Sequence, residues 1–277
     1  MFGFFKRSWS RGPSTPEPDG EVDVEVILGF VLLKGDTSLP EVVAHLTGAG
    51  VSVDADQAGG TQDDTTVFCH LGGHALSVSL FDAPVPDQEA ENLAHPLFFP
   101  GAQERLAGYD RHLVVARLGT LSEPEVGVHD VATALAAIKA HATVTAHLLG
   151  LKQAVGVYSG RVGTTYAPEV FRGAVLEDAP RSVYVAPTWL RHGERPGTVT
   201  SYTFGLSDLG LAELQVTDTR LDAEEVFVYL SDITEYILSG ARIRAGETLG
   251  RTNEERLPTR WAPWLVDAEV TALQIEM

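Results

Sequence analysis

The chain has one cysteine and no long apolar run, and each of these scarcities excludes a class of protein. Cys69 alone cannot close an intramolecular disulfide or supply the several thiolates of a structural zinc site. The longest apolar stretch, 26–33, is shorter than the ~18 residues that cross a bilayer. Residues 1–9 lack the continuous apolar core and cleavage site of a secretory signal. These observations predict a cytoplasmic protein with a buried, unreactive thiol.

Basic residues are especially scarce in the N-terminal part of the chain. The whole chain carries a net charge of −18, and residues 12–104 hold sixteen acidic residues against one base, Lys34. An acidic surface repels phosphate, so we expect no binding to nucleic acid. The acidity indicates either a role in solubility or a face for a protein partner with a basic surface. Four lysines among twenty basic residues are typical of a high-GC bacterial source.

The first residues stand apart from the rest of the sequence. Residues 1–11 combine aromatic and basic side chains, and residues 11–20 hold three prolines, two glycines and no apolar side chain. We predict a disordered tail over residues 1–20, because such a segment cannot bury an apolar core. Peripheral membrane contact through residues 1–11 is the alternative to a frayed terminus; no membrane-spanning segment is expected.

The order of expected elements predicts an α+β fold. Strands are expected at 22–33, 66–71, 75–81 and 112–118, with helices at 39–50 and 87–93 and a hairpin turn at Gly72-Gly73. This β-α-β-β-α-β succession is the ferredoxin-like order. Further on we expect a long alanine-rich helix at 130–149, strands at 154–158, 182–185 and 199–204, and a loop at 189–197.

The pattern therefore predicts two ferredoxin-like or βαβ-type halves with a mixed, mainly antiparallel sheet and flanking helices. We place an N-terminal module at 21–120 and a C-terminal module at 121–277.

The clearest single element is a helix between 222 and 240. Asp222 can cap its start, and Gly240 can end it in the left-handed conformation that lacks a Cβ penalty. Between them the aliphatic side chains recur at spacings of four, three and four, which places on one helical face Val226, Leu230, Ile233 and Ile237.

The block that contains this helix resembles a known bacterial family. The stretch from Tyr202 to Val216 follows a T-x-G-L-x-x-F/L-G-x-x-E-L/I pattern, and residues 245–250 follow a G-x-T-I/L-G pattern. The matching positions are Thr203, Gly205, Leu206, Gly210, Glu213, Gly246, Thr248 and Gly250. The block is similar to the family called domain of unknown function 4261. This family has no established activity, so the resemblance implies a fold and no catalytic residues.

Patterns of known chemistry are missing from the sequence. His70 and His74 flank the expected hairpin turn and would point to opposite faces, and His141 and His147 would diverge around a helix. Neither a phosphate-binding glycine loop nor a nucleophile elbow occurs. We therefore predict no catalytic residue, no metal site and no cofactor.

Three residues near the family-like block remain as speculative ligand-binding candidates: Trp189, His192 and Glu213. Glu213 lies among apolar residues, where a carboxylate is unfavourable unless it is paired or has a function. One interpretation places it on a polar outer face or beside Arg242 or Arg244; the other places it in a cleft with Trp189 and His192.

The sequence favours a cytoplasmic bacterial interaction or accessory protein without catalysis, with an immunity-like role as one possibility. The alternatives are a hydrolase that uses Glu213 and His192 in a dispersed site, and a module that binds a small ligand between the two halves.

Overall fold

The computed structural model describes residues 8–9, 22, 27–54, 65–120, 130–177, 180–252 and 254–277. Apart from Ser8–Trp9, the expected tail at 1–20 lies outside these residues. The chain forms two compact units, the first spanning Val22–Val185 and the second built mainly from Ala186–Met277.

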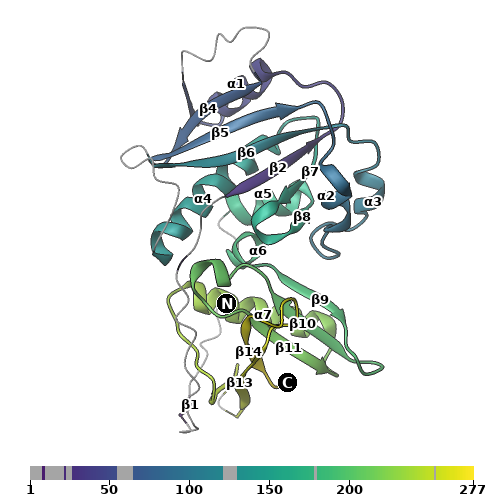
Figure 1. Ribbon diagram of the computed structural model, residues 1–277, viewed down its shortest axis with the longest axis vertical. Coiled ribbons are helices and arrows are strands. Elements are labelled where there is room, and N and C mark those ends of the chain that lie inside the picture. Colours follow the sequence, from purple (N-terminus) through teal and green to yellow (C-terminus); the bar gives the residue numbers. More distant parts are fainter. Residues whose placement is uncertain are drawn as a thin grey trace. The chain divides into compact units, whose positions relative to one another are not determined.

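The first unit is built on a seven-stranded sheet (Figure 1). Its strands are β2 (Leu28–Leu33), β3 (Ser52–Val53), β4 (Thr66–Leu71), β5 (His74–Phe81), β6 (Arg111–Thr120), β7 (Ala154–Ser159) and β8 (Thr164–Tyr166). They lie in the order β3-β4-β5-β6-β2-β7-β8, and every neighbouring pair is antiparallel. The turn between β4 and β5 is Gly72-Gly73, both with positive φ, as the sequence predicts.

Helices cover one face of this sheet. They are α1 (Leu39–Gly48), α4 (Val131–Leu148), α5 (Pro168–Leu176) and α6 (Ser182–Val185), and α4 packs on β2, β5 and β6. The alanines of α4 allow close approach, and at Gly29 of β2 a Cβ would lie only 2.9 Å from Cε1 of His141. The missing side chain at Gly29 therefore makes room for the His141 ring.

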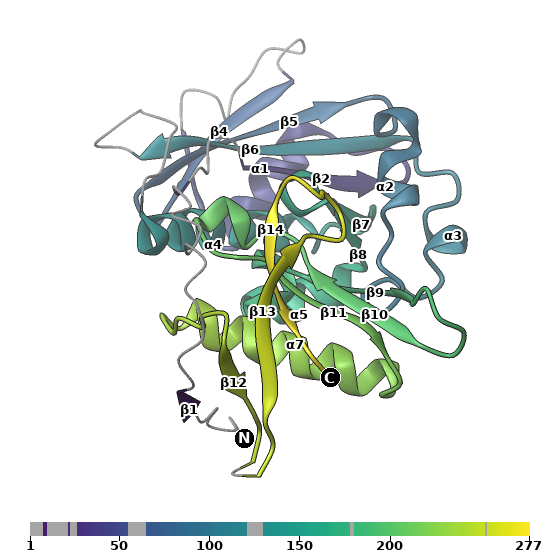
Figure 2. The same cartoon turned by 60° about the horizontal axis from the view of Figure 1, so that its bottom comes forward.

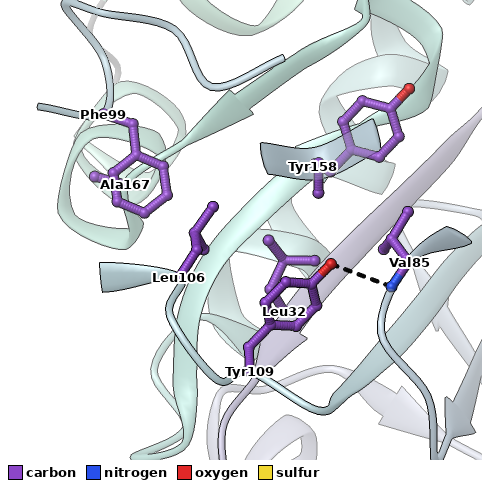
Figure 3. Packing of buried hydrophobic residues seen from close by; sticks show 8 residues of the cluster. Leu32, Val85, Phe99, Leu106, Tyr109, Tyr158 and Ala167 are labelled. Carbon is purple, nitrogen blue, oxygen red and sulfur yellow. Dashed lines mark hydrogen bonds between the residues drawn. The ribbon is translucent and has the colours of Figure 1, made fainter. Parts of the chain in front are cut away.

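A separate segment, residues 82–110, covers the β2–β7 end of the opposite face. It contains the short helices η1 (Pro86–Gln88), α2 (Glu89–Asn92) and α3 (Ala102–Arg105). Figure 3 shows its buried side chains packed on Leu32 and Tyr158 of the sheet. The hydroxyl of Tyr109 accepts a hydrogen bond of 3.2 Å from the backbone N–H of Val85, which ties the two ends of the segment together.

The α+β class with mainly antiparallel sheets and flanking helices is confirmed, but the pairing of the strands is not ferredoxin-like. β4, β5 and β6 are consecutive antiparallel neighbours, and β2 pairs with β6 and β7. The first unit also runs to residue 185 instead of 120, because β7 and β8 complete its sheet and α4 fills its core. The boundary expected at 120/121 therefore falls inside one unit.

The second unit has a seven-stranded mixed sheet and one long helix. The strands are β1 (Ser8–Trp9), β9 (Thr188–His192), β10 (Val199–Thr203), β11 (Leu214–Thr219), β12 (Glu247–Leu249), β13 (Leu257–Pro263) and β14 (Thr271–Ile275). Their order is β1-β12-β13-β14-β11-β10-β9, and only β11 and β14 are parallel neighbours. Helix α7 (Ala223–Leu238) packs along β9, β10 and β11 (Figure 2).

Helix α7 confirms the clearest expectation from the sequence. The carboxylate of Asp222 accepts a hydrogen bond of 2.9 Å from the N–H of Glu224, and Gly240 follows the helix with φ of +100°. The four residues of the predicted stripe are all buried.

Two local expectations are wrong. Residues 182–185 form the helical turn α6 and not a strand, because Tyr184 and Val185 donate their N–H groups to the carbonyl of Arg181. The expected loop at 189–197 begins with strand β9, which pairs along β10 from Thr188 to His192. Short runs rich in β-branched and aromatic residues fit either state, and only the tertiary partner decides between them.

Candidate functional site

The block that resembles a known family folds into a loop closed around one carboxylate. β10 ends at Thr203 and β11 begins at Leu214, and the loop between them contains the single turn η3 (Ser207–Leu209). Gly205 and Gly210 have φ of +118° and +64°, a conformation that other residues rarely adopt. The glycines of the motif are thus explained by the shape of the loop.

Glu213 holds this loop from inside and is completely buried. Its Oε1 accepts three hydrogen bonds, from the N–H of Gly205 at 2.8 Å, the N–H of Ser207 at 2.9 Å and Oγ of Ser207 at 3.0 Å. Its Oε2 accepts a bond of 2.7 Å from Oγ1 of Thr203, which in turn accepts the N–H of Leu214 at 2.8 Å. One side chain therefore satisfies donors at both ends of the loop.

The chemistry of Glu213 is that of a structural group. Burial raises its pKa above the ordinary glutamate value, while the hydrogen bonds from Ser207, Thr203 and Gly205 act in the opposite direction. In the protonated form the carboxyl can donate to Oγ1 of Thr203, so the loop accommodates either charge state. The buried carboxylate holds the backbone of the loop through these hydrogen bonds.

Glu213 is thus not on an outer face, and its carboxylate accepts from Thr203, Gly205 and Ser207 instead of pairing with Arg242 or Arg244, so that interpretation is wrong. Trp189 and His192 lie on β9, where Thr188 pairs with Thr203 and His192 pairs with Val199. His192 is exposed. It lies four residues along β9 from Thr188, the residue paired with Thr203, which corresponds to about 13 Å along a strand. The structure therefore brings Glu213 together with Thr203 and Ser207, and does not bring it together with His192.

A second cluster of polar side chains lies inside the first unit, where it lines a small cavity beneath α4. The lining includes the polar residues His141, Thr145, Ser159, Arg161 and Tyr184. Its volume of about 10 Å³ corresponds to roughly one water molecule. Arg161 donates hydrogen bonds to the carbonyl oxygens of Tyr184 and Val185, which fixes the guanidinium against α6. This size is compatible with a solvation site and leaves no room for a metabolite.

His141 is the titratable group of this cavity. Its Nε2 lies 2.9 Å from the carbonyl oxygen of Val115, so Nε2 carries the proton and Nδ1 is the acceptor. Burial lowers the pKa of His141 from 6.5 to about 4, with a smaller opposing effect from Val115 and a further decrease from the Arg161 cation. The imidazole is therefore neutral near pH 7 and a weak base.

Other histidines of the described chain also make internal contacts. Nδ1 of His112 donates to the carbonyl of Ala83 at 2.7 Å, and Nδ1 of His95 accepts the N–H groups of Leu97 and Phe98. His70 on β4 is half-buried, whereas His74 on β5 is buried. The two rings thus lie on opposite faces of the sheet, as the hairpin register predicts.

Three other features of the described residues bear on function. No group of three His, Cys, Asp or Glu side chains is arranged to hold a metal ion there. Every helix in that part of the chain is too short or too polar to cross a bilayer. The thiol of Cys69 is buried and has its pKa raised to about 11, first by burial and then by Asp54. Such a thiol is a poor nucleophile, as the sequence predicts.

The fold defines an α+β protein of two units, each with its own sheet and core. Residues 202–276 match the sequence profile of a family described as "Domain of unknown function (DUF4261)". The match confirms the resemblance seen in the sequence and covers most of the second unit. Comparison with curated proteins and with solved structures gave no match.

The motif led to Glu213 but not to its role. The spacing of Thr203, Gly205 and Glu213 is local, so the sequence could have indicated a carboxylate that closes a loop. The cavity around His141 had no such signal, because its residues come from elements far apart in the sequence: β2, α4, β7, η2 (Gly160–Val162), α5 and α6.

Proposed function

We propose that this protein is a non-catalytic binding protein of the bacterial cytoplasm whose partner presents a basic surface. The observation that supports this function is the charge of residues 82–110, which we call the acidic cap. Five of its carboxylates are exposed: Asp82, Asp87, Glu89, Glu104 and Asp110. Its one cation, Arg105, is engaged by both carboxylate oxygens of Glu169 in α5, at 2.6 and 2.9 Å. Two cations from outside the segment also contact it, since Arg111 lies 3.0 Å from Asp82 and Nζ of Lys34 donates to the carbonyl of Ala107 at 2.7 Å. The acidic cap still carries more carboxylates than these cations balance.

The acidic cap is also firmly attached, which a recognition surface requires. Its buried residues pack on the sheet, and Asp87 and Gln88 are held at positive φ, 57° and 56°, immediately before α2. Such conformations cost energy in residues other than glycine and persist where the surroundings impose them. A fixed display of negative charge speeds association with a basic partner and selects against acidic ones.

The test is capture of partners by the full chain and by two charge-reversed variants. One variant carries Asp87→Lys, Glu89→Lys and Glu104→Lys in the acidic cap. The matched control carries Glu224→Lys, Glu254→Lys and Glu269→Lys, three exposed acids of the second unit. We expect basic proteins to be recovered by the natural chain and the control at low salt, and to be released as salt rises. Equal capture by both variants would remove the acidic cap from the proposed function.

A further inference from the structure

The sheet of the first unit has a second face that the acidic cap covers only in part. Along β4, β5 and β6 the burial alternates, with inward residues buried and outward residues half-buried or exposed. The outward residues of these three strands form what we call the outer face, which combines apolar side chains such as Phe81, Val114, Ala116 and Leu118 with a similar number of polar ones such as Ser77 and Ser79. A solvent-facing side of an antiparallel sheet normally carries mostly polar residues, so this composition needs an explanation.

A row of rings connects the outer face to the buried cluster under the acidic cap. Tyr158 stacks on Phe30 with ring centroids 5.5 Å apart, and Phe30 lies 5.8 Å from His112. His112 then stacks on Phe81 at 5.2 Å with an interplanar angle of 6°. The row crosses β7, β2, β6 and β5, and Phe81 at its end is 47% exposed. The apolar packing of the core thus continues to the exposed ring of Phe81.

Charge is distributed around the outer face and not on it. None of the outward positions that the structure describes on β4, β5 and β6 carries Asp, Glu, Lys or Arg. At the rim, Asp82 follows Phe81 directly, and the carboxylate of Asp54 lies 3.2 Å from Nδ1 of His70. Arg111 contacts both Asp82 and Asp36, which leaves one net negative charge in that group. An apolar surface with an acidic rim complements an apolar surface with a basic rim.

We propose that the outer face is the docking surface for an amphipathic, lysine- or arginine-rich helix of the partner. The apolar side of that helix packs on the outward side chains around Leu118 and Phe81, as α4 packs on the opposite face. Its basic residues meet Asp54, Asp82 and the acidic cap. The inference rests on the proposed function, since it takes the same basic partner and specifies where and through which chemistry it binds.

Two pairs of residues provide matched variants for the test. Leu118 on the outer face is 38% exposed and Leu176 on α5 is 39% exposed, so Leu118→Lys and Leu176→Lys replace leucines of matched exposure. Phe81 at 47% and Val228 on α7 at 45% form a second pair. The probe is an amphipathic helical peptide of leucine and lysine. A peptide of the same composition with scrambled order serves as its control.

We expect the leucine–lysine peptide to bind the natural chain and to protect amides of β4, β5 and β6 from hydrogen exchange. Leu118→Lys and Phe81→Lys should weaken binding at least about tenfold, since each places a cation in an apolar contact beneath a basic helix. Leu176→Lys and Val228→Lys should leave binding unchanged. Far-UV circular dichroism shows whether each variant is folded.

Several outcomes would overturn the docking surface. Equal binding of the scrambled peptide means that charge alone attracts it, which contradicts the docking surface and leaves the acidic cap as the binding site. Loss of binding in Leu176→Lys as well as in Leu118→Lys places the contact elsewhere. A dimer of the natural chain in sedimentation that Leu118→Lys dissociates would make a second copy the occupant. Capture lost on reversing the cap but kept in Leu118→Lys preserves the proposed function and removes this inference.

Discussion

Replacing Glu213 tests the role of the family-like motif most directly. In Glu213→Ala the N–H of Gly205 and the hydroxyl of Thr203, both at buried residues, lose their acceptor. A buried donor without a partner costs about 1–3 kcal/mol, so two such donors cost about 2–6 kcal/mol. Burying a carboxylate is itself unfavourable, so its removal recovers part of this free energy. We therefore expect the free energy of unfolding to fall by about 3 kcal/mol.

Glu213→Gln separates the hydrogen bonds from the charge. The amide oxygen keeps the acceptor for Gly205 and Ser207, and the amide N–H can donate to Oγ1 of Thr203, as the protonated acid would. We expect this variant to lose less than about 1.5 kcal/mol. Because burial raises the pKa of Glu213, its contribution to stability is greatest below pH 4.5 and declines as the pH rises through the raised value. Glutamine should therefore improve relative to the natural residue as the pH rises.

The assay is urea unfolding followed by tryptophan fluorescence. Residues 22–185 contain no tryptophan, so the signal of the four tryptophans reports on the second unit and residue 9. Glu269→Ala removes an exposed acid of the same unit and should change stability by less than about 0.5 kcal/mol. If Glu213→Ala unfolds at the same urea concentration as Glu269→Ala, the carboxylate does not hold the loop.

Two further predictions concern single sites. The pKa of His141 is lowered from 6.5 to about 4, so its contribution to stability is present above pH 6.5 and is lost as the pH falls toward 4. The free energy of unfolding should fall by about 3 kcal/mol over this pH range, as measured by acid unfolding followed by circular dichroism. The fall should be absent in His141→Gln. Equal pH profiles of the natural chain and the variant would contradict this prediction. Gly173 in α5 and Gly240 after α7 both have open space for a Cβ, but only Gly240 has positive φ. Gly173→Ala should stabilise the chain by up to about 1 kcal/mol and Gly240→Ala should destabilise it by about 1–2 kcal/mol in thermal melts; shifts of the same sign would contradict this.

Local patterns in the sequence were enough for elements whose ends and faces are marked by nearby residues. Helix α7 has its cap, its apolar stripe and its terminal glycine within one window, and the β4–β5 hairpin has its turn between two alternating strands. The thiol of Cys69 and the resemblance of the C-terminal block also followed from the sequence, because each depends on residues close along the chain.

Only the tertiary structure decided what residues far apart do together. The pairing of β2 with β6 and β7, the extension of the first unit to residue 185 and the helical state of 182–185 depend on long-range contacts. The same holds for the cavity at His141 and for the outer face beside the acidic cap. Periodicity shows that a side chain faces one side of an element; which neighbour covers that side is determined when distant strands and helices pack.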